Sequence, residues 1–233
     1  MQNKYLLEIS VESDDAAMAA ERGGADRIEI CRDSKVGGVT PAGILMMGTR
    51  ANVQLPIFAM IRPRAGDFVY SDEEFAAMKK SVKHAKQFQL DGVVLGILTA
   101  DFRVDVARTQ ELVALAAPAP VTFHRAFDEC VDLRKSLEGV IKTGATRLLT
   151  SGGKQTAPEA LETIAELVRI AGERLTVMPG SGIHAGNIRE AAQKTGAREF
   201  HAGLSSVIAS PVDNLAAYEA EVRKLAGALR HCE

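Results

Sequence analysis

Eight short apolar runs, each about the length of one β-strand, recur along the chain with segments of helical spacing between them. Strands that alternate with helices pair in parallel, because a parallel pair needs a long crossover connection. Eight such repeats predict a single α/β domain over residues 1–233, a (β/α)8 TIM barrel whose barrel covers about 5–229. The runs are Leu6–Val11, Arg27–Cys31, Pro56–Arg62, Gly92–Leu98, Pro120–Arg125, Arg147–Ser151, Leu175–Gly180 and Glu199–Gly203.

A doubly wound sheet has the same alternation of strand and helix and is the alternative fold. Such a sheet normally carries a glycine-rich turn after its first strand, whereas Ser10–Asp14 contains no glycine. The helix boundaries agree with the repeat: Ser71 and Glu74 have the spacing of a capping box at the start of the predicted helix Asp72–Phe88. A second helix is predicted over Pro158–Ala171.

The composition disfavours several classes of function. A formal net charge of −2 and a pI near 6.2 argue against a broad surface for nucleic acid or for an anionic membrane. We expect no membrane span, which would need roughly 18 apolar residues, and no signal peptide. Cys31, Cys130 and Cys232 form no CxxC pair, which disfavours a disulfide framework or a structural zinc site. We therefore expect a cytoplasmic protein.

Polar residues alternate with apolar residues in several of the predicted strands. Alternate residues face opposite sides, and the helices need the apolar side, so the polar set is predicted to point into the barrel. A carboxylate there is costly unless it has a partner, which favours a functional cluster. The alternative is a purely structural network of ion pairs with Arg62 and Arg147. The inward residues of interest are Glu8, Glu29, Glu199, His124 and His201.

The loop after the third predicted strand concentrates charge. Arg62 and Arg64 lie at the end of this strand, and two guanidinium groups suit a carboxylate or a phosphate. Both arginines and the nearby Asp67 are therefore candidate ligand-binding residues. In the alternative interpretation, Asp67 pairs with an arginine and only fastens the loop.

The sixth and seventh predicted strands run into loops rich in glycine and serine. Backbone N–H groups in such loops near a helix start can bind an anion, and the late loops of these barrels often hold phosphate. Glycines also serve ordinary tight turns, so neither loop is specific by itself. The candidate ligand-binding residues here are Ser151, Gly180, Ser181 and Gly182.

The fifth predicted strand reaches its most reactive residues as it ends, in the segment PVTFHRAFD over Pro120–Asp128. The active face of a parallel barrel lies at the carboxyl ends of its strands. His124 is therefore predicted to be a general acid or base oriented by Asp128, with Glu29 or Glu8 as a second proton carrier. Met60, by contrast, is interpreted as a core residue.

Several segments together resemble the CutC family, whose members are known as copper homeostasis proteins. The resemblance runs from about Leu6 to Ser206 and implies a cytoplasmic TIM barrel, an oligomer of two or four subunits, and copper handling. The matching segments are EISVES, GGADRIEIC, GGVTP, IRPRAGDFVYS, VTFHRAFDE, RLLTSGG, VMPGSGI and EFH. The polar residues that fall on these motifs are Glu8, Glu29, Arg62, Arg64, Asp67, His124, Asp128 and His201.

The resemblance also supplies the metal hypothesis, in which Cys31 and His201 bind copper. Cys31 has the inward parity near a strand end, and a thiolate is a preferred ligand of copper(I). Some relatives have a cysteine where this chain has Ser10, so a site made by two cysteines is not available here.

Two functions therefore stay open, together with a third in which the barrel is a scaffold that has lost its reaction. The first is copper homeostasis through bound copper. The second is an enzyme that acts on a small anionic metabolite, with or without a phosphate group, by acid–base chemistry at the barrel mouth. Arg62 favours the second, because a guanidinium group repels a metal cation and attracts an anion.

Overall fold

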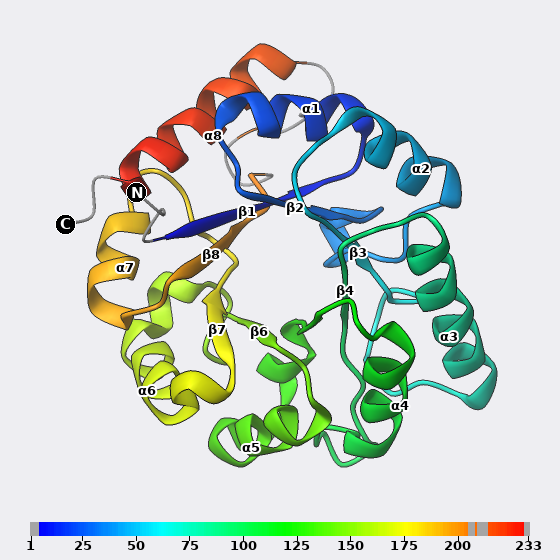
Figure 1. Ribbon diagram of the computed structural model, residues 1–233. Helices are drawn as coiled ribbons and strands as arrows, with labels where there is room; N and C mark the ends of the chain where they lie inside the picture. Colours follow the sequence, from blue (N-terminus) through cyan, green and yellow to red (C-terminus); the bar gives the residue numbers. More distant parts are fainter. Residues whose placement is uncertain (1–4, 205–207, 209–213, 231–233) are drawn as a thin grey trace.

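The computed structural model describes residues 5–204, 208 and 214–230. Within this part of the chain, strands and helices alternate around one barrel (Figure 1). The strands are β1 (Leu6–Val11), β2 (Arg27–Ile30), β3 (Ile57–Met60), β4 (Gly92–Leu95), β5 (Val121–Phe123), β6 (Arg147–Thr150), β7 (Thr176–Pro179) and β8 (Glu199–Ala202). The helices are α1 (Asp14–Gly23), α2 (Gly43–Asn52), α3 (Asp72–Gln87), α4 (Val106–Ala116), α5 (Leu133–Thr143), α6 (Leu161–Ala171), α7 (Ile188–Thr195) and α8 (Leu215–Arg230).

All the strand pairs are parallel, in the order β7-β6-β5-β4-β3-β2-β1-β8. The strands β7 and β8 lie side by side, although no hydrogen-bonded ladder joins them in the described ranges. The two strands touch near the cavity end, because a Cβ added to Gly180 would lie 3.2 Å from the Cβ of His201. The predicted TIM barrel is confirmed, with one seam between β7 and β8.

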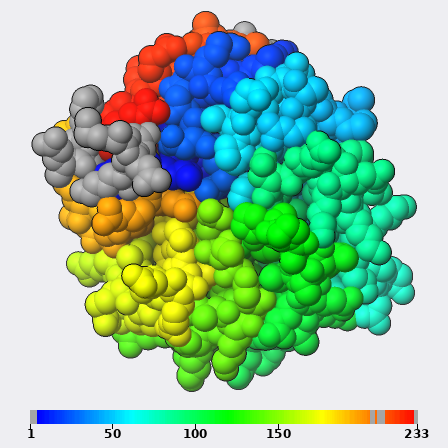
Figure 2. Space-filling view, viewed as in Figure 1, coloured from blue at the N-terminus to red at the C-terminus, as the bar shows by residue number. Residues whose placement is uncertain are grey.

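The helices follow one another around the barrel in chain order, as the run of colours in Figure 2 shows. The first and last helices are neighbours: Arg22 of α1 forms an ion pair with Glu219 of α8 at 2.8 Å. A Cβ on Gly23 would lie 2.6 Å from Val222, so glycine allows α1 to approach α8 closely. No helix of the described residues combines the length and apolar character that a membrane span requires.

Local sequence signals account for the helix boundaries. The capping box predicted at α3 is present, because Ser71 accepts from the Glu74 backbone N–H and the Glu74 side chain accepts from the Ser71 N–H. The predicted helix at Pro158 begins differently. A 3-10 turn, η3 (Ala157–Ala160), comes first, and α6 starts only at Leu161. Three further 3-10 turns are η1 (Ser34–Val36), η2 (Arg125–Glu129) and η4 (Gly172–Arg174).

The side-chain alternation holds as predicted. The outward set of β1 and β2, which includes Leu7 and Ile28, packs in the main core between strands and helices. The inward residues of neighbouring strands share levels, because Glu8 is in register with both Arg27 of β2 and His201 of β8. A second, small apolar cluster lies apart from the main core and consists of Cys31, Phe58, Met60 and Val94.

Candidate functional site

A cavity of about 780 Å³ opens at the carboxyl ends of the strands. Residues from β1, β2, β3, β5, β6, β7 and β8, or from the loops directly after them, contribute to its wall. Eight residues singled out in the sequence line it: Glu29, Cys31, Arg62, His124, Asp128, Ser181, Gly182 and His201. Five others lie outside its lining: Glu8, Arg64, Asp67, Ser151 and Gly180.

Two carboxyl groups and an imidazole converge at the inner end of this cavity, where Glu29 and His201 line the floor and Glu8 lies behind them. Glu8, Glu29 and His201 each offer a ligand atom within 4.8 Å of the other two. The Nδ1 atom of His201 lies 2.7 Å from Oε1 of Glu8, and both side chains are buried. Burial acts to raise the pKa of Glu8, but Arg27 and His201 outweigh it and lower the pKa to about 2. The pair is therefore an ionised carboxylate that holds a histidine ring.

Arg27 is the cation that pairs with Glu8 and Glu199, and the sequence interpretation missed it. Its Nε donates to Glu8 at 2.5 Å, and its Nη2 donates to Glu199 at 2.7 Å. Arg147 joins the network through Glu199 at 2.8 Å, as the structural alternative predicted. The partner predicted in that alternative, Arg62, takes no part, so that expectation was wrong. Arg27 has the same inward parity as Glu29, which is the signal that could have identified it.

Glu29 of β2 and Cys31, the residue directly after this strand, occupy the next inward positions beyond Arg27. Oε1 of Glu29 accepts from the Ser10 hydroxyl at 3.1 Å, whereas Oε2 is buried and has no partner in the described chain. Burial raises the pKa of Glu29. Burial, reinforced by the charge of Glu29, raises the pKa of Cys31 to about 12. Without a bound cation, Cys31 is therefore a thiol.

Met60 belongs to the cavity wall as well, although the sequence suggested only a core role. A Cβ on Gly38 would lie 3.4 Å from both Sγ of Cys31 and Cε of Met60, so the two sulfur-bearing side chains are close neighbours. Gly38 has a positive φ of 81°, and its missing side chain leaves room beside them. The sequence lacked a signal for this pair, because only folding brings the ends of β2 and β3 together.

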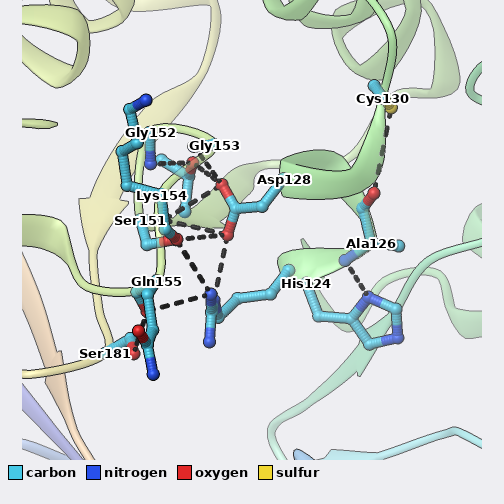
Figure 3. Close-up of polar contacts among 12 residues, drawn as sticks. His124, Ala126, Asp128, Cys130, Ser151, Gly152, Gly153, Lys154, Gln155 and Ser181 are labelled. Atoms are coloured by element: carbon cyan, nitrogen blue, oxygen red, sulfur yellow. Dashed lines mark hydrogen bonds and ion pairs between the residues drawn. The ribbon is translucent and has the colours of Figure 1, made fainter. Parts of the chain in front are cut away.

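His124 does not interact with Asp128, which corrects the predicted acid–base pair (Figure 3). The His124 Nδ1 accepts from the backbone N–H of Ala126 at 3.2 Å, so the ring proton lies on Nε2. Nε2 is buried without a partner in the described residues. Burial, with Arg62 and Arg125 nearby, lowers the pKa of His124 to about 3. The ring is neutral and can donate one hydrogen bond.

Asp128 instead fills the loop after β6, where the sequence predicted a site for an external anion (Figure 3). Its Oδ1 accepts from the backbone N–H groups of Ser151 at 3.1 Å and Gly153 at 3.0 Å. The hydroxyl of Thr150 donates to the same oxygen at 2.5 Å, and Nε of Arg125 donates to Oδ2 at 2.9 Å. The chain therefore supplies its own anion to this loop, which we call the β6 cradle (Thr150–Gly153).

The two arginines of the loop after β3 differ in their surroundings, because only Arg62 lines the cavity. Arg62 is buried and lines the cavity, and it donates to the backbone carbonyls of Val36 at 2.8 Å, Gly38 at 3.1 Å and Gly66 at 2.7 Å. The acceptors of its guanidinium group are backbone carbonyls, and no carboxylate of the described residues forms an ion pair with it.

Arg64 is bound on the other side of the same loop. It donates to Glu74 at 2.6 Å and to Asp67 at 3.0 Å, outside the cavity wall. These contacts match the alternative interpretation, in which Asp67 pairs with an arginine and fastens the loop.

The loop after β7 keeps its place in the wall through other contacts. The Ser181 hydroxyl donates to the carbonyl of Gln155 at 2.9 Å, and the Gly180 N–H donates to the carbonyl of Thr150 at 3.0 Å. Ser181 and Gly182 both have a φ of 72° and both line the cavity. This loop is therefore the glycine-rich segment that an external ligand can approach.

The fold and the site together define a TIM-barrel protein with a buried polar site at the carboxyl ends of its strands. The CutC family profile matches residues 5–206, and the chain belongs to the CutC family. A relative from Chromobacterium violaceum named as a family protein CutC is 48% identical over 88% of this chain and 83% of its own length. The Homo sapiens copper homeostasis protein cutC homolog is 44% identical over 88% of this chain and 75% of its own length.

Solved structures agree with this membership. The CutC structure from Streptococcus agalactiae matches with a TM-score of 0.81 and 30% identity, over 85% of this chain and 98% of that one. Thiamine phosphate pyrophosphorylase from Pyrococcus furiosus matches with a TM-score of 0.64 and 17% identity, over 97% and 98% of the two chains. The second likeness shows the shared fold alone. The family resemblance seen in the sequence motifs is confirmed.

Proposed function

We propose that this chain acts in copper homeostasis and that copper(I) binds in the barrel mouth. The names of its relatives support the role. The observation that carries the site is the pair of sulfur side chains, Cys31 and Met60, on the cavity wall. Thiolate and thioether are the ligands that copper(I) prefers, and the His201 imidazole on the same wall is a compatible third donor.

The donor set fits one copper(I) ion of low coordination number. The buried Cys31 thiol must lose its proton to bind the metal, so copper(I) binding is expected to release one proton to the solvent. Glu8 holds Nδ1 of His201, which leaves Nε2 as the coordinating atom. Ser10, whose hydroxyl lies 3.5 Å from Sγ of Cys31, stands where some relatives supply a second thiol.

Replacing Cys31 with alanine is expected to abolish tight copper(I) binding. The reason is that the variant loses the thiolate, the donor with the highest affinity for this ion. Anaerobic competition with a copper(I) chelator would measure the affinity. Cys130→Ala is the matched control, because that buried cysteine contacts the Ala126 carbonyl and does not line the cavity. Stoichiometric binding retained by the Cys31 variant would remove Cys31 from the site.

A second candidate function is an enzyme that acts on a small anionic metabolite. A specific observation favours it: three cavity residues each hold a buried polar atom without a partner in the described chain. These atoms are Oε2 of Glu29, Nε of Arg62 and Nε2 of His124. Buried polar groups in proteins are nearly always hydrogen-bonded, and those left over at a cavity suit a ligand.

The roles in this second function follow from the contacts. Arg62 attracts the anion, and the neutral His124 donates from Nε2 to a carbonyl or carboxylate oxygen. The Glu8–His201 pair suits proton transfer, because the carboxylate fixes the ring and stabilises its charged form. A phosphate group would have to use the loop at Ser181 and Gly182, because Asp128 already fills the β6 cradle.

In a thermal-shift screen, anionic metabolites are expected to raise the melting temperature of the parent protein, and Arg62→Ala is expected to lose the increase. A ligand at about 100 times its Kd stabilises by roughly 2.7 kcal/mol, which is an increase in melting temperature of about 5–10 °C for a chain of this size. Each variant is compared with its own ligand-free melting temperature, because Arg62 also binds loop carbonyls. Arg64→Ala is the control. If no anion stabilises the parent, the second function loses its support.

We also infer a cytoplasmic location and a homo-oligomer of two or four subunits. The free thiols of Cys31 and Cys130 support a reducing compartment. The apolar side chains of Ile44 and Met47 on α2, 75% and 46% exposed as residues, support a surface for subunit contact. Cell fractionation and analytical ultracentrifugation would test the two inferences.

A further inference from the structure

One atom of the cavity floor is left unexplained by a copper(I) site. Oε2 of Glu29 is buried and has no hydrogen-bond partner among the described residues, although Glu29 is only 3% exposed. Its other oxygen accepts a single bond, from Ser10. Burial of a carboxyl group without partners is unfavourable, and a cation removes the cost. Copper(I) does not suit this atom, because a soft ion prefers sulfur to oxygen.

The neighbouring His201 has the environment of a metal-binding histidine. Its Nδ1 is held by Glu8 at 2.7 Å, and Glu8 is in turn held by Arg27. A histidine that binds a metal almost always donates its other ring N–H to a carboxylate or carbonyl, which fixes the ring. Because Nδ1 is held by Glu8, Nε2 is the ring nitrogen that remains for a metal, and the His201 side chain lines the cavity.

We propose that Glu29 and His201 bind a divalent transition-metal ion at the cavity floor, with Glu8 as the residue that positions His201. Each of the three residues offers one ligand atom within 4.8 Å of the other two, so Glu29 and His201 lie close enough to share one ion. This site deepens the proposed role of the barrel mouth as a binding site and rests on that role. It uses Glu29 in place of the sulfur pair of Cys31 and Met60 and shares only His201 with the proposed copper(I) site.

The donor types define the class of ion. One carboxylate and one imidazole suit zinc, manganese or another first-row divalent ion, whereas calcium and magnesium prefer oxygen ligands only. The remaining coordination positions face the cavity and are open to water or to a ligand oxygen. In the surrounding network three carboxylates, those of Glu8, Glu29 and Glu199, face two guanidinium groups. The excess carboxylate offsets part of the charge of a divalent ion.

Isothermal titration of the metal-free, full-length protein with Zn²⁺ and with Mn²⁺ tests the proposal. The parent is expected to bind one ion, and Glu29→Gln, which keeps the shape of the side chain, is expected to weaken binding at least about 100-fold. Glu129→Gln is the matched control, because Glu129 is a cavity carboxylate outside the cluster. It should bind like the parent. Mg²⁺ should give no comparable signal.

The test also separates this site from the copper(I) site. Glu29→Gln should keep copper(I) binding, and Cys31→Ala should keep Zn²⁺ and Mn²⁺ binding. The absorption spectrum of the Co²⁺-loaded parent should lack a thiolate-to-cobalt charge-transfer band, since sulfur is not a ligand. The proposal is overturned if the parent binds neither Zn²⁺ nor Mn²⁺, if Glu29→Gln binds as tightly as the parent, or if Cys31→Ala loses divalent binding. None of these results depends on whether copper(I) binds.

Discussion

Replacing Arg27 with methionine is expected to lower the free energy of unfolding by about 3–5 kcal/mol. Arg27 is 2% exposed and is held between the carboxylates of Glu8 and Glu199. Methionine preserves much of the apolar volume, but it leaves Glu8 ionised or forces it to take up a proton inside the barrel. Removing one partner of a buried ion pair is far more costly than removing both, because the remaining charge has no compensation.

Urea denaturation at neutral pH would measure this loss. Arg103→Met is the control, since Arg103 pairs with Asp101 at the surface, where the two side chains are 70% and 63% exposed. An exposed pair of this kind contributes at most about 1 kcal/mol. A loss below about 1 kcal/mol for Arg27→Met would mean that the buried network adapts without its central cation.

Asp128→Ala is expected to lower the free energy of unfolding by about 2–4 kcal/mol, and added formate is expected to restore part of it. The substitution removes the acceptor for the N–H groups of Ser151 and Gly153 and for the hydroxyl of Thr150. These donors lie in the partly buried β6 cradle and would lose a charged partner. Formate carries the missing carboxylate and is small enough to occupy the space that the side chain leaves.

Thermal melts in sodium formate and in sodium chloride of equal ionic strength would reveal the rescue. Asp101→Ala provides the comparison, because its exposed carboxylate binds Thr99 and Arg103 at the surface and leaves no enclosed space. The control should show neither the loss nor the formate effect. Equal melting curves for Asp128→Ala in the two salts would show that the β6 cradle does not accept an external anion.

Copper(II) and copper(I) are expected to bind to different side chains of this cavity. Among divalent first-row ions, copper(II) binds nitrogen and oxygen donors most tightly. We therefore expect copper(II) to occupy the Glu29–His201 site whether or not copper is the natural ion there. Only copper(I), measured without oxygen, reports on the sulfur pair of Cys31 and Met60.

Much of the fold was predictable because it depends on local patterns. The eight apolar runs, the inward parity of Glu8 and Glu29 and the capping box at Ser71 all follow from the chemistry of near neighbours. The strand lengths were less accurate. The run predicted over Pro56–Arg62 is longer than the strand itself, since β3 spans only Ile57–Met60. Periodicity cannot show where pairing stops.

The partners of the site residues were harder to predict than their positions. Parity places Arg27 inside the barrel, but the choice of Glu8 and Glu199 as its partners depends on reach across the interior. His124 and Asp128 are four positions apart in the sequence, yet they do not bind each other. Nδ1 of the histidine accepts from the backbone N–H of Ala126, and the carboxylate accepts from the N–H groups of the β6 cradle. Competition from backbone N–H groups is decided by loop conformation, which the residue types do not specify.

The buried ion pairs have a consequence for the molecule as a whole. From His201 at the cavity floor, contacts continue through Glu8, Arg27 and Glu199 to Arg147, the first residue of β6, whose side chain is 20% exposed. Acidic and basic side chains thus alternate in one connected network between the cavity and the amino-terminal end of β6. A substitution that removes the charge of Arg147 is therefore expected to change the electrostatic environment of His201 through this network, although Arg147 does not line the cavity.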